Sequence, residues 1–315
     1  EERTFPYLVV GMAPLHKPGH SPGPNAIKAL ANMSERGLPP GLIGCDRAYT
    51  GQKPENFRLP ALALGHELVI DYKNTELGRQ GSYGGALLVD GSWYCPSMPT
   101  DLIEATAEFR AGLIDEALWQ ERVKGRRSYV FRAKARPDED GSQRLLCPAA
   151  GAAPTTRCPL KKKSTTRQTL GKTPIVLTAD VEADPPAVCR QDSVTFPPEA
   201  GDRYLQALPH ATPEWHKTYA SLRNTIEGLN GIVKDGTYEA LADSTRRRVR
   251  GVAAQSVLVA FGLFAVNLRK IDTFLRLAVV EPDGTLRVPL KRRHKDPQID
   301  ETGSRAGGSD PPNTG

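Results

Sequence analysis

The sequence lacks several patterns that commonly identify metal sites and exported proteins. No Cys-x2-Cys pair occurs, and the six histidines are scattered along the chain. No secretory signal is visible in the sequence, and no internal repeat runs along it. A Cys-x2-Cys zinc knuckle is therefore not expected, and nothing in the sequence indicates export.

Aspartate is also unevenly distributed, and Asp46 is the first one in the chain. A helical pattern over 25–35 ends at Gly37, and the short apolar run 42–45 is typical of a buried parallel strand. A helix over about 54–64 and a second strand over 67–72 follow. Ligand groups gather where parallel strands end, which makes Asp46 a candidate site residue. The alternative interpretation is an N-cap or turn residue.

A second candidate carboxylate, Glu227, lies on a predicted helix. The helix begins at Thr212, an N-cap hydroxyl that proline follows. One edge of it is apolar, and the adjoining edge carries Tyr219, Arg223, Glu227, Asn230 and Lys234. A carboxylate between two cations is either a site or a solvated helix edge. Gly228 and Gly231 each cost about 1 kcal/mol in a helix, which favours close approach of another backbone or a ligand.

These elements, in this order, resemble the DDE transposases of bacterial insertion sequences, whose catalytic core is ribonuclease-H-like. Asp46, followed by Tyr49, is similar to the family's second catalytic Asp. Arg223-x3-Glu227-x6-Lys234 is similar to its Glu helix, although Tyr219 lies one residue further from the Arg than usual. The resemblance covers about residues 5–73 and 212–272.

The resemblance implies DNA strand cleavage and transfer by Asp46 and Glu227, which would hold Mg²⁺ or Mn²⁺. Such displacements at phosphorus use two metal ions about 3.5–4 Å apart. The side chains expected to contact DNA phosphates are Tyr49, Tyr219, Arg223, Lys234, Arg246, Arg247, Arg248 and Arg250. A bacterial, cytoplasmic, nucleoid-associated protein that forms a homo-oligomer on DNA is expected, with no membrane partner.

One departure from the family pattern concerns the first catalytic Asp, which has no counterpart before Asp46. The run 5–12 is similar to a later strand of the family's sheet. We therefore expect a carboxyl-terminal portion of a longer transposase, without the opening strands or an amino-terminal DNA-binding domain. With two of three carboxylates, the metal pair would be under-coordinated, so this portion is expected to be inactive alone. The alternative is a non-catalytic nucleic-acid-binding relic of a transposase.

Charge is consistent with a DNA partner. The formal net charge is +6 and the isoelectric point about 9.0, which favours association with a polyanion. Basic residues cluster at 161–163, 246–250 and 291–295, and each cluster can also be read as solvated surface.

The predicted fold is α/β, with an incomplete ribonuclease-H-like core, an inserted loop-rich α+β region and carboxyl-terminal helices. Its parts are the first part of the core (1–73), the insertion (74–211), the Glu helix with a core helix (212–275), and a tail (276–315) that is largely disordered after 297. Within the insertion we expect a hairpin over 86–94 that turns at Asp90-Gly91, and one amphipathic helix over 101–124.

Cysteines are concentrated in the insertion. It contains four of the five, namely Cys95, Cys147, Cys158 and Cys189, and proline follows the first three. They are candidate ligands of a closed tetrahedral Zn²⁺ site, which would make the insertion a zinc-stapled interaction module. Scattered reduced thiols and disulfides are the other interpretations. Cys45, on the predicted strand, is expected to be an inert core thiol.

The apolar run 251–268 has positive flanks and is just long enough to cross a membrane. Gln255, Ser256 and Asn267 weaken that interpretation. The apolar stripe of the Glu227 helix offers a partner, so a core helix is expected.

Overall fold

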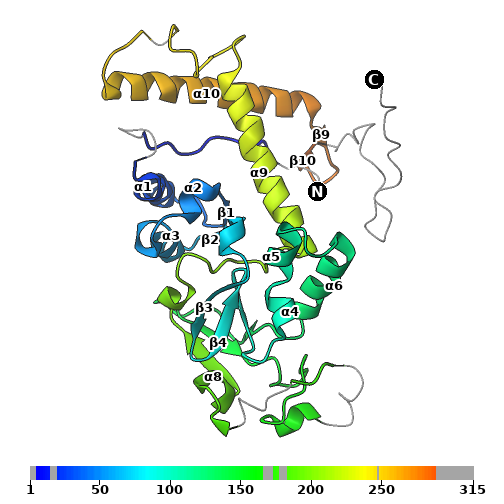
Figure 1. Ribbon diagram of the computed structural model, residues 1–315. Helices are drawn as coiled ribbons and strands as arrows, with labels where there is room; N and C mark the ends of the chain where they lie inside the picture. Colours follow the sequence, from blue (N-terminus) through cyan, green and yellow to red (C-terminus); the bar gives the residue numbers. More distant parts are fainter. Residues whose placement is uncertain (1–4, 15–19, 166–172, 177–182, 247, 289–315) are drawn as a thin grey trace, which may run out of the picture.

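The computed structural model describes residues 5–14, 20–165, 173–176, 183–246 and 248–288. The fold is mixed α/β, with 42% helix and 14% strand, and the strands of the described part fall into small separate sheets. In Figure 1 the long helix α10 (Val252–Leu277) lies at one end, the amino-terminal helices lie in the middle, and the insertion lies at the other end.

A parallel two-stranded unit forms the middle of the molecule. Strands β1 (Leu42–Gly44) and β2 (Glu67–Val69) pair in parallel, with Gly44 opposite Val69, as the apolar runs predict. The helical segments around this pair are α1 (Pro22–Glu35), α2 (Arg47–Thr50), η1 (Pro54–Asn56) and α3 (Arg58–Ala63). Helix α1 ends before Gly37, whose φ of 74° is the left-handed conformation that glycine adopts at low cost.

The core beneath this unit is continuous with the start of α9 (Pro213–Lys234). Ile70 and Tyr72 are fully buried beside Phe57 and Leu68. Trp215 on α9 is also buried, and its indole N–H donates to the carbonyl oxygen of Ile70 at 3.2 Å. This packing attaches the amino-terminal end of α9 to the strand pair.

The predicted strand over 5–12 is wrong, since this segment joins none of the sheets that the structure describes. The segment instead bonds to α10. The backbone N–H of Val9 donates to Asn267 Oδ1 at 2.9 Å, and Asn267 Nδ2 donates to the Val9 carbonyl at 2.7 Å. A side-chain amide thus satisfies backbone groups that a neighbouring strand would otherwise bond.

The described part of the insertion contains two small antiparallel sheets and several short helices. Its strands are β3 (Arg79–Tyr83), β4 (Ala86–Val89) and β5 (Ser92–Tyr94) in one sheet, and β6 (Arg132–Ala133), β7 (Gln143–Leu146) and β8 (Ser193–Phe196) in the other. Its remaining segments are η2 (Asn74–Glu76), α4 (Thr100–Ile103), α5 (Ala105–Arg110), α6 (Glu116–Arg126), η3 (Lys162–Thr165), α8 (Ala187–Arg190) and η4 (Pro198–Gly201). The predicted hairpin is confirmed, because β4 and β5 join through Asp90 and Gly91, both with positive φ.

The single helix predicted over 101–124 is wrong. Three helices, α4, α5 and α6, occupy this stretch. Gly112, with a φ of 73°, follows the end of α5 and reverses the chain. Asp115 then caps α6 by accepting the N–H of Leu118 at 2.8 Å. An apolar periodicity can continue across such a break, so the pattern alone does not reveal the turn at Gly112 or the cap at Asp115.

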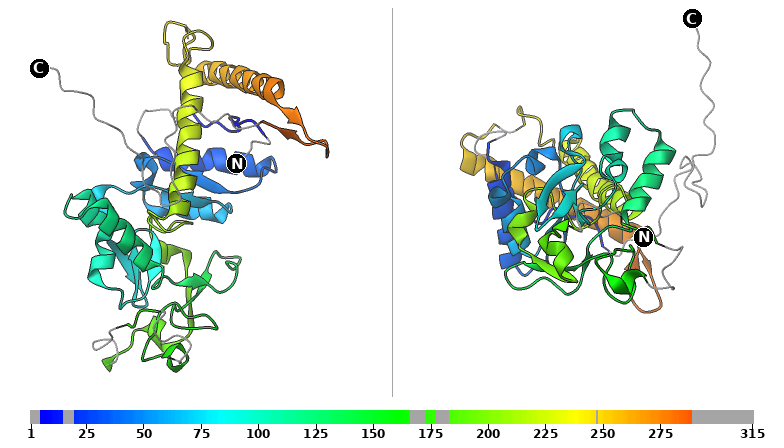
Figure 2. Two further views of the ribbon diagram at one scale, coloured as in Figure 1. Left: turned by 90° about the vertical axis from the view of Figure 1, so that its right-hand side faces the viewer. Right: turned by 60° about the horizontal axis from the view of Figure 1, so that its bottom comes forward.

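The two carboxyl-terminal helices were expected to pack along one another, but they cross instead. Helix α10 crosses α9 near the carboxyl-terminal end of α9 (Figures 1 and 2), and the apolar edge of α9 meets the strand pair at Trp215 and Leu222. Helix α10 has the length and composition of a membrane span, and 6% of its most apolar window is buried. A short ribbon, β9 (Val279–Val280) with β10 (Leu286–Arg287), follows it. The tail beyond 288, including the expected disorder after 297, lies outside the described residues.

Candidate active site

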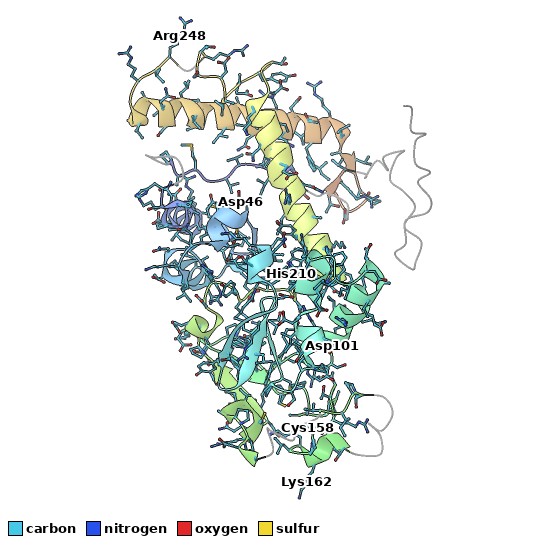
Figure 3. All side chains as sticks on the ribbon, in the orientation of Figure 1. Asp46, Asp101, Cys158, Lys162, His210 and Arg248 are labelled. Atoms are coloured by element: carbon cyan, nitrogen blue, oxygen red, sulfur yellow. The ribbon has the colours of Figure 1, made fainter. Side chains whose placement is uncertain are left out.

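Asp46 lies two residues beyond the end of β1, at the start of α2 (Figure 3). Its side chain is exposed, and Oδ1 accepts the N–H of Ala48 at 2.8 Å. The ring of Tyr49 packs on Phe57, with centroids 5.3 Å apart. Burial, and then the charge of Asp46, raise the pKa of Tyr49. Asp46 therefore has both the strand-end position expected of a site residue and the bonding of a turn residue.

On α9, the predicted polar edge forms a connected row. Arg223 Nε donates to Glu227 Oε1 at 2.8 Å, and both side chains are about 60% exposed. The bond to Glu227, and then the bond to Tyr219, raise the pKa of Arg223. Tyr219 in turn stacks on Trp215, with centroids 4.8 Å apart. Lys234 is exposed in the last turn of the helix.

The strand and the helix that carry the two carboxylates pack directly on one another. A Cβ on Gly44 would lie only 2.7 Å from Leu222 Cβ, so glycine permits the close approach of α9 to β1. Glu227 follows Leu222 by about 7.5 Å along the helix axis and is turned by about 140° from it around that axis. Asp46 follows Gly44 by at most about 7 Å of chain. Their segments are neighbours. A carboxylate separation below about 12 Å, which a shared metal pair requires, stays a prediction.

The same contact yields a stability prediction. Gly44→Ala should destabilise the chain by about 1–3 kcal/mol, because the added methyl group overlaps Leu222 and displaces α9. Gly41→Ala is the matched control, since a Cβ there meets nothing within 4 Å. Urea unfolding of both variants checks the prediction, and equal losses would mean that α9 does not pack tightly on β1.

No other segment of the described chain packs closely on the two glycines of α9. A Cβ on Gly228 or Gly231 would meet nothing within 4 Å in the described part of the chain. The expectation that another backbone closely approaches them is therefore wrong there, and approach by a ligand stays a prediction.

Asp71 is a strand-end carboxylate that sequence analysis missed. Since Gly44 pairs with Val69, Asp46 and Asp71 stand at matching positions, each two residues past its strand. Asp71 Oδ1 lies 3.1 Å from His210 Nε2 and 3.6 Å from Arg110 Nη2. The sequence signal was present, because each of the two apolar runs ends in an aspartate.

The arginine-rich turn lies away from the carboxylates. Figure 3 shows Arg248 at the α10 end of the molecule and Asp46 in its middle. Arg246, Arg248 and Arg250 are exposed, and Arg246 Nε lies 3.9 Å from Asp243 Oδ2. Arg247 and the basic cluster 291–295 lie outside the described residues. The structure therefore does not bring the arginine turn into one site with Asp46.

The four cysteines of the insertion lie together. Cys95, Cys147, Cys158 and Cys189 line one small cavity of about 10 Å³. Burial raises the pKa of Cys95 to about 12 and that of Cys189 to about 11. Cys158 lies at the opposite end of the molecule from Arg248 (Figure 3). Cys45 is separate and half-buried, and burial followed by the Asp46 charge raises its pKa to about 12, as expected of an inert thiol.

Two further observations concern metal binding and the position of the larger cavity. In the described ranges, no three His, Cys, Asp or Glu side chains form a ready metal-binding group. A cavity of about 280 Å³ opens between α3, β2 and the β6–β8 sheet, with Arg58, His66 and Glu67 among its polar lining. Neither Asp46 nor Glu227 lines this cavity.

Comparison of the chain with protein-family models, with curated proteins and with solved structures finds no match in any of the three.

Proposed function

We propose that the chain is part of a DDE-type transposase, with an incomplete ribonuclease-H-like core, that cuts and joins DNA with Mg²⁺ or Mn²⁺. One observation carries the proposal. The parallel β1–β2 pair is packed against α9 at Gly44 and Leu222, with Asp46 just past one strand and Glu227 on the facing helix. Sequence-distant carboxylates on a strand end and a helix are what such a core uses to hold metal.

The proposed DNA cleavage requires Glu227 to leave Arg223 and bind a metal ion. In-line displacement at phosphorus needs carboxylate oxygens on the metal ions, whereas Glu227 is bonded to Arg223. That ion pair is solvent-exposed and therefore weak, so a divalent cation can compete for Glu227 at low cost. Arg223, once released, offers a planar fork to a phosphate, and Lys234 offers a point charge.

A non-catalytic nucleic-acid-binding role is the second candidate. The Arg223–Glu227 pair favours it, as does the absence of a ready group of three carboxylates in the described part. In that case the basic surface of the chain would bind phosphates without cleaving DNA.

Iron-directed cleavage of the polypeptide separates the two candidates. Fe²⁺ in place of Mg²⁺, with ascorbate and peroxide, produces radicals that cut the chain beside the bound ion. The transposase proposal predicts cuts near both Asp46 and Glu227, and their loss in Asp46→Asn and Glu227→Gln. Glu121→Gln, which changes an exposed glutamate on α6, should leave both cuts in place. Cuts at neither site would favour the non-catalytic role.

A further inference from the structure

The cysteine cavity joins parts of the insertion that are far apart in sequence. Cys95 follows β5, Cys147 follows β7, Cys158 lies in the next loop, and Cys189 lies in α8. Cys147 and Cys158 belong to the apolar cluster around Trp93 and Phe196. Cys95 belongs to a second cluster, around Tyr94 and Met98. The four thiols therefore meet where the two apolar clusters of the insertion adjoin.

Three of the cysteines each begin a turn of the same type. Pro96, Pro148 and Pro159 follow Cys95, Cys147 and Cys158. In each turn the N–H three residues after the cysteine donates to the cysteine carbonyl, from Met98 at 3.0 Å, Ala150 at 2.9 Å and Lys161 at 2.9 Å. Proline after the first residue fixes such a turn, and it also removes an N–H from the loop.

A cation already lies beside the cavity. Lys161 lines it, its side chain is 11% exposed, and its Nζ lies 3.2 Å from Asp192 Oδ1. Four thiolates around one Zn²⁺ ion carry a net charge of minus two. Lys161 would offset part of that charge.

We propose that Cys95, Cys147, Cys158 and Cys189 bind one Zn²⁺ ion in a closed tetrahedral site that joins the two apolar clusters of the insertion. Binding forms four Zn–S bonds of about 2.3 Å and releases the four thiol protons to solvent, with no change in oxidation state. The described thiols do not yet stand in a ready metal-binding group, so their side chains must rotate onto the ion. The site is structural and does not depend on the proposed transposase activity.

Metal analysis of the full chain, purified under reducing conditions and dialysed against a weak chelator, tests the site. We expect one zinc ion per chain, and Co²⁺ in its place should show the strong thiolate-to-cobalt charge-transfer absorption of a four-sulfur site. Cys95→Ser and Cys158→Ser should each lose the metal, whereas the control Cys45→Ser should retain it.

The proposal is overturned if folded wild-type chain binds neither zinc nor cobalt stoichiometrically. It is also overturned if the cysteines of the cavity are found as disulfides, or if Cys95→Ser and Cys158→Ser bind zinc as tightly as wild type. Should the serine variants fail to fold, the cobalt spectrum of the wild-type chain decides. None of these measurements involves DNA or Mg²⁺, so their outcome is separate from that of iron-directed cleavage.

Discussion

Replacing Arg126 by methionine is expected to destabilise the chain by about 3–5 kcal/mol, the usual cost of leaving one charge of a buried pair unpaired. Arg126 and Asp90 are 3% and 1% exposed, and Nη1 lies 2.6 Å from Asp90 Oδ2. Arg126 also donates to the carbonyls of Leu102 at 2.6 Å and Ile103 at 3.1 Å. One guanidinium thus ties α6 to α4 and to the β4–β5 turn. Urea unfolding of the variant measures the loss.

Two variants isolate burial as the cause. Arg127→Met removes the next residue's ion pair with Glu214, whose side chains are 55% and 63% exposed, and should cost less than about 1 kcal/mol. Adding Asp90→Asn to Arg126→Met should recover part of the stability, because asparagine is neutral and tolerates the positive φ of this position. A similar loss in Arg126→Met and Arg127→Met would show that the buried charge is not what matters.

Replacing Arg246, Arg247 and Arg248 together by alanine is expected to weaken DNA binding and to flatten its salt dependence. Each phosphate contact contributes roughly −0.9 to the log–log slope, so three lost contacts would flatten it by up to about 2.7. All DNA sequences should weaken alike, since phosphate contacts carry no sequence information. Arg246 and Arg248 are exposed and precede the amino-terminal end of α10, where the helix dipole disfavours cations and a polyanion would offset that cost.

Fluorescence anisotropy with unrelated duplexes over a salt series measures both effects. A control triple variant removes the same charge from exposed arginines elsewhere, at Arg36, Arg136 and Arg276. If the two triple variants bind alike, the arginine turn is ordinary solvated surface. The transposase proposal would then rest on Asp46 and Glu227 alone.

Local signals allowed several elements to be predicted from the sequence. The Asp90-Gly91 turn needs positive φ at both positions, which few other residue pairs tolerate, so the hairpin could be predicted. Thr212 caps α9 by accepting the N–H of Trp215 at 3.3 Å, as its hydroxyl before proline indicated. The parallel pairing of β1 and β2 followed from two apolar runs separated by a helical segment.

Predictions that depended on a distant partner were less successful. Segment 5–12 has the composition of a strand, yet its backbone bonds to Asn267 on α10, more than two hundred residues away. The apolar edge of α9 could pack on α10 or on the strands, and the contact between Gly44 and Leu222 places part of it on the strands. Periodicity identifies an apolar edge but does not identify what covers it.

The same distinction between local signals and distant contacts applies to the candidate sites. The sequence by itself determined the residue types, the row of Tyr219, Arg223 and Glu227 along one edge of α9, and the three Cys-Pro turns, because each depends on neighbours within one helical turn or one loop. Only the tertiary structure decided that β1 packs on α9, that the arginine turn lies apart from Asp46, and that four cysteines line one cavity. These arrangements depend on contacts between segments far apart in the chain, whose relative positions are set by packing and burial rather than by local propensity.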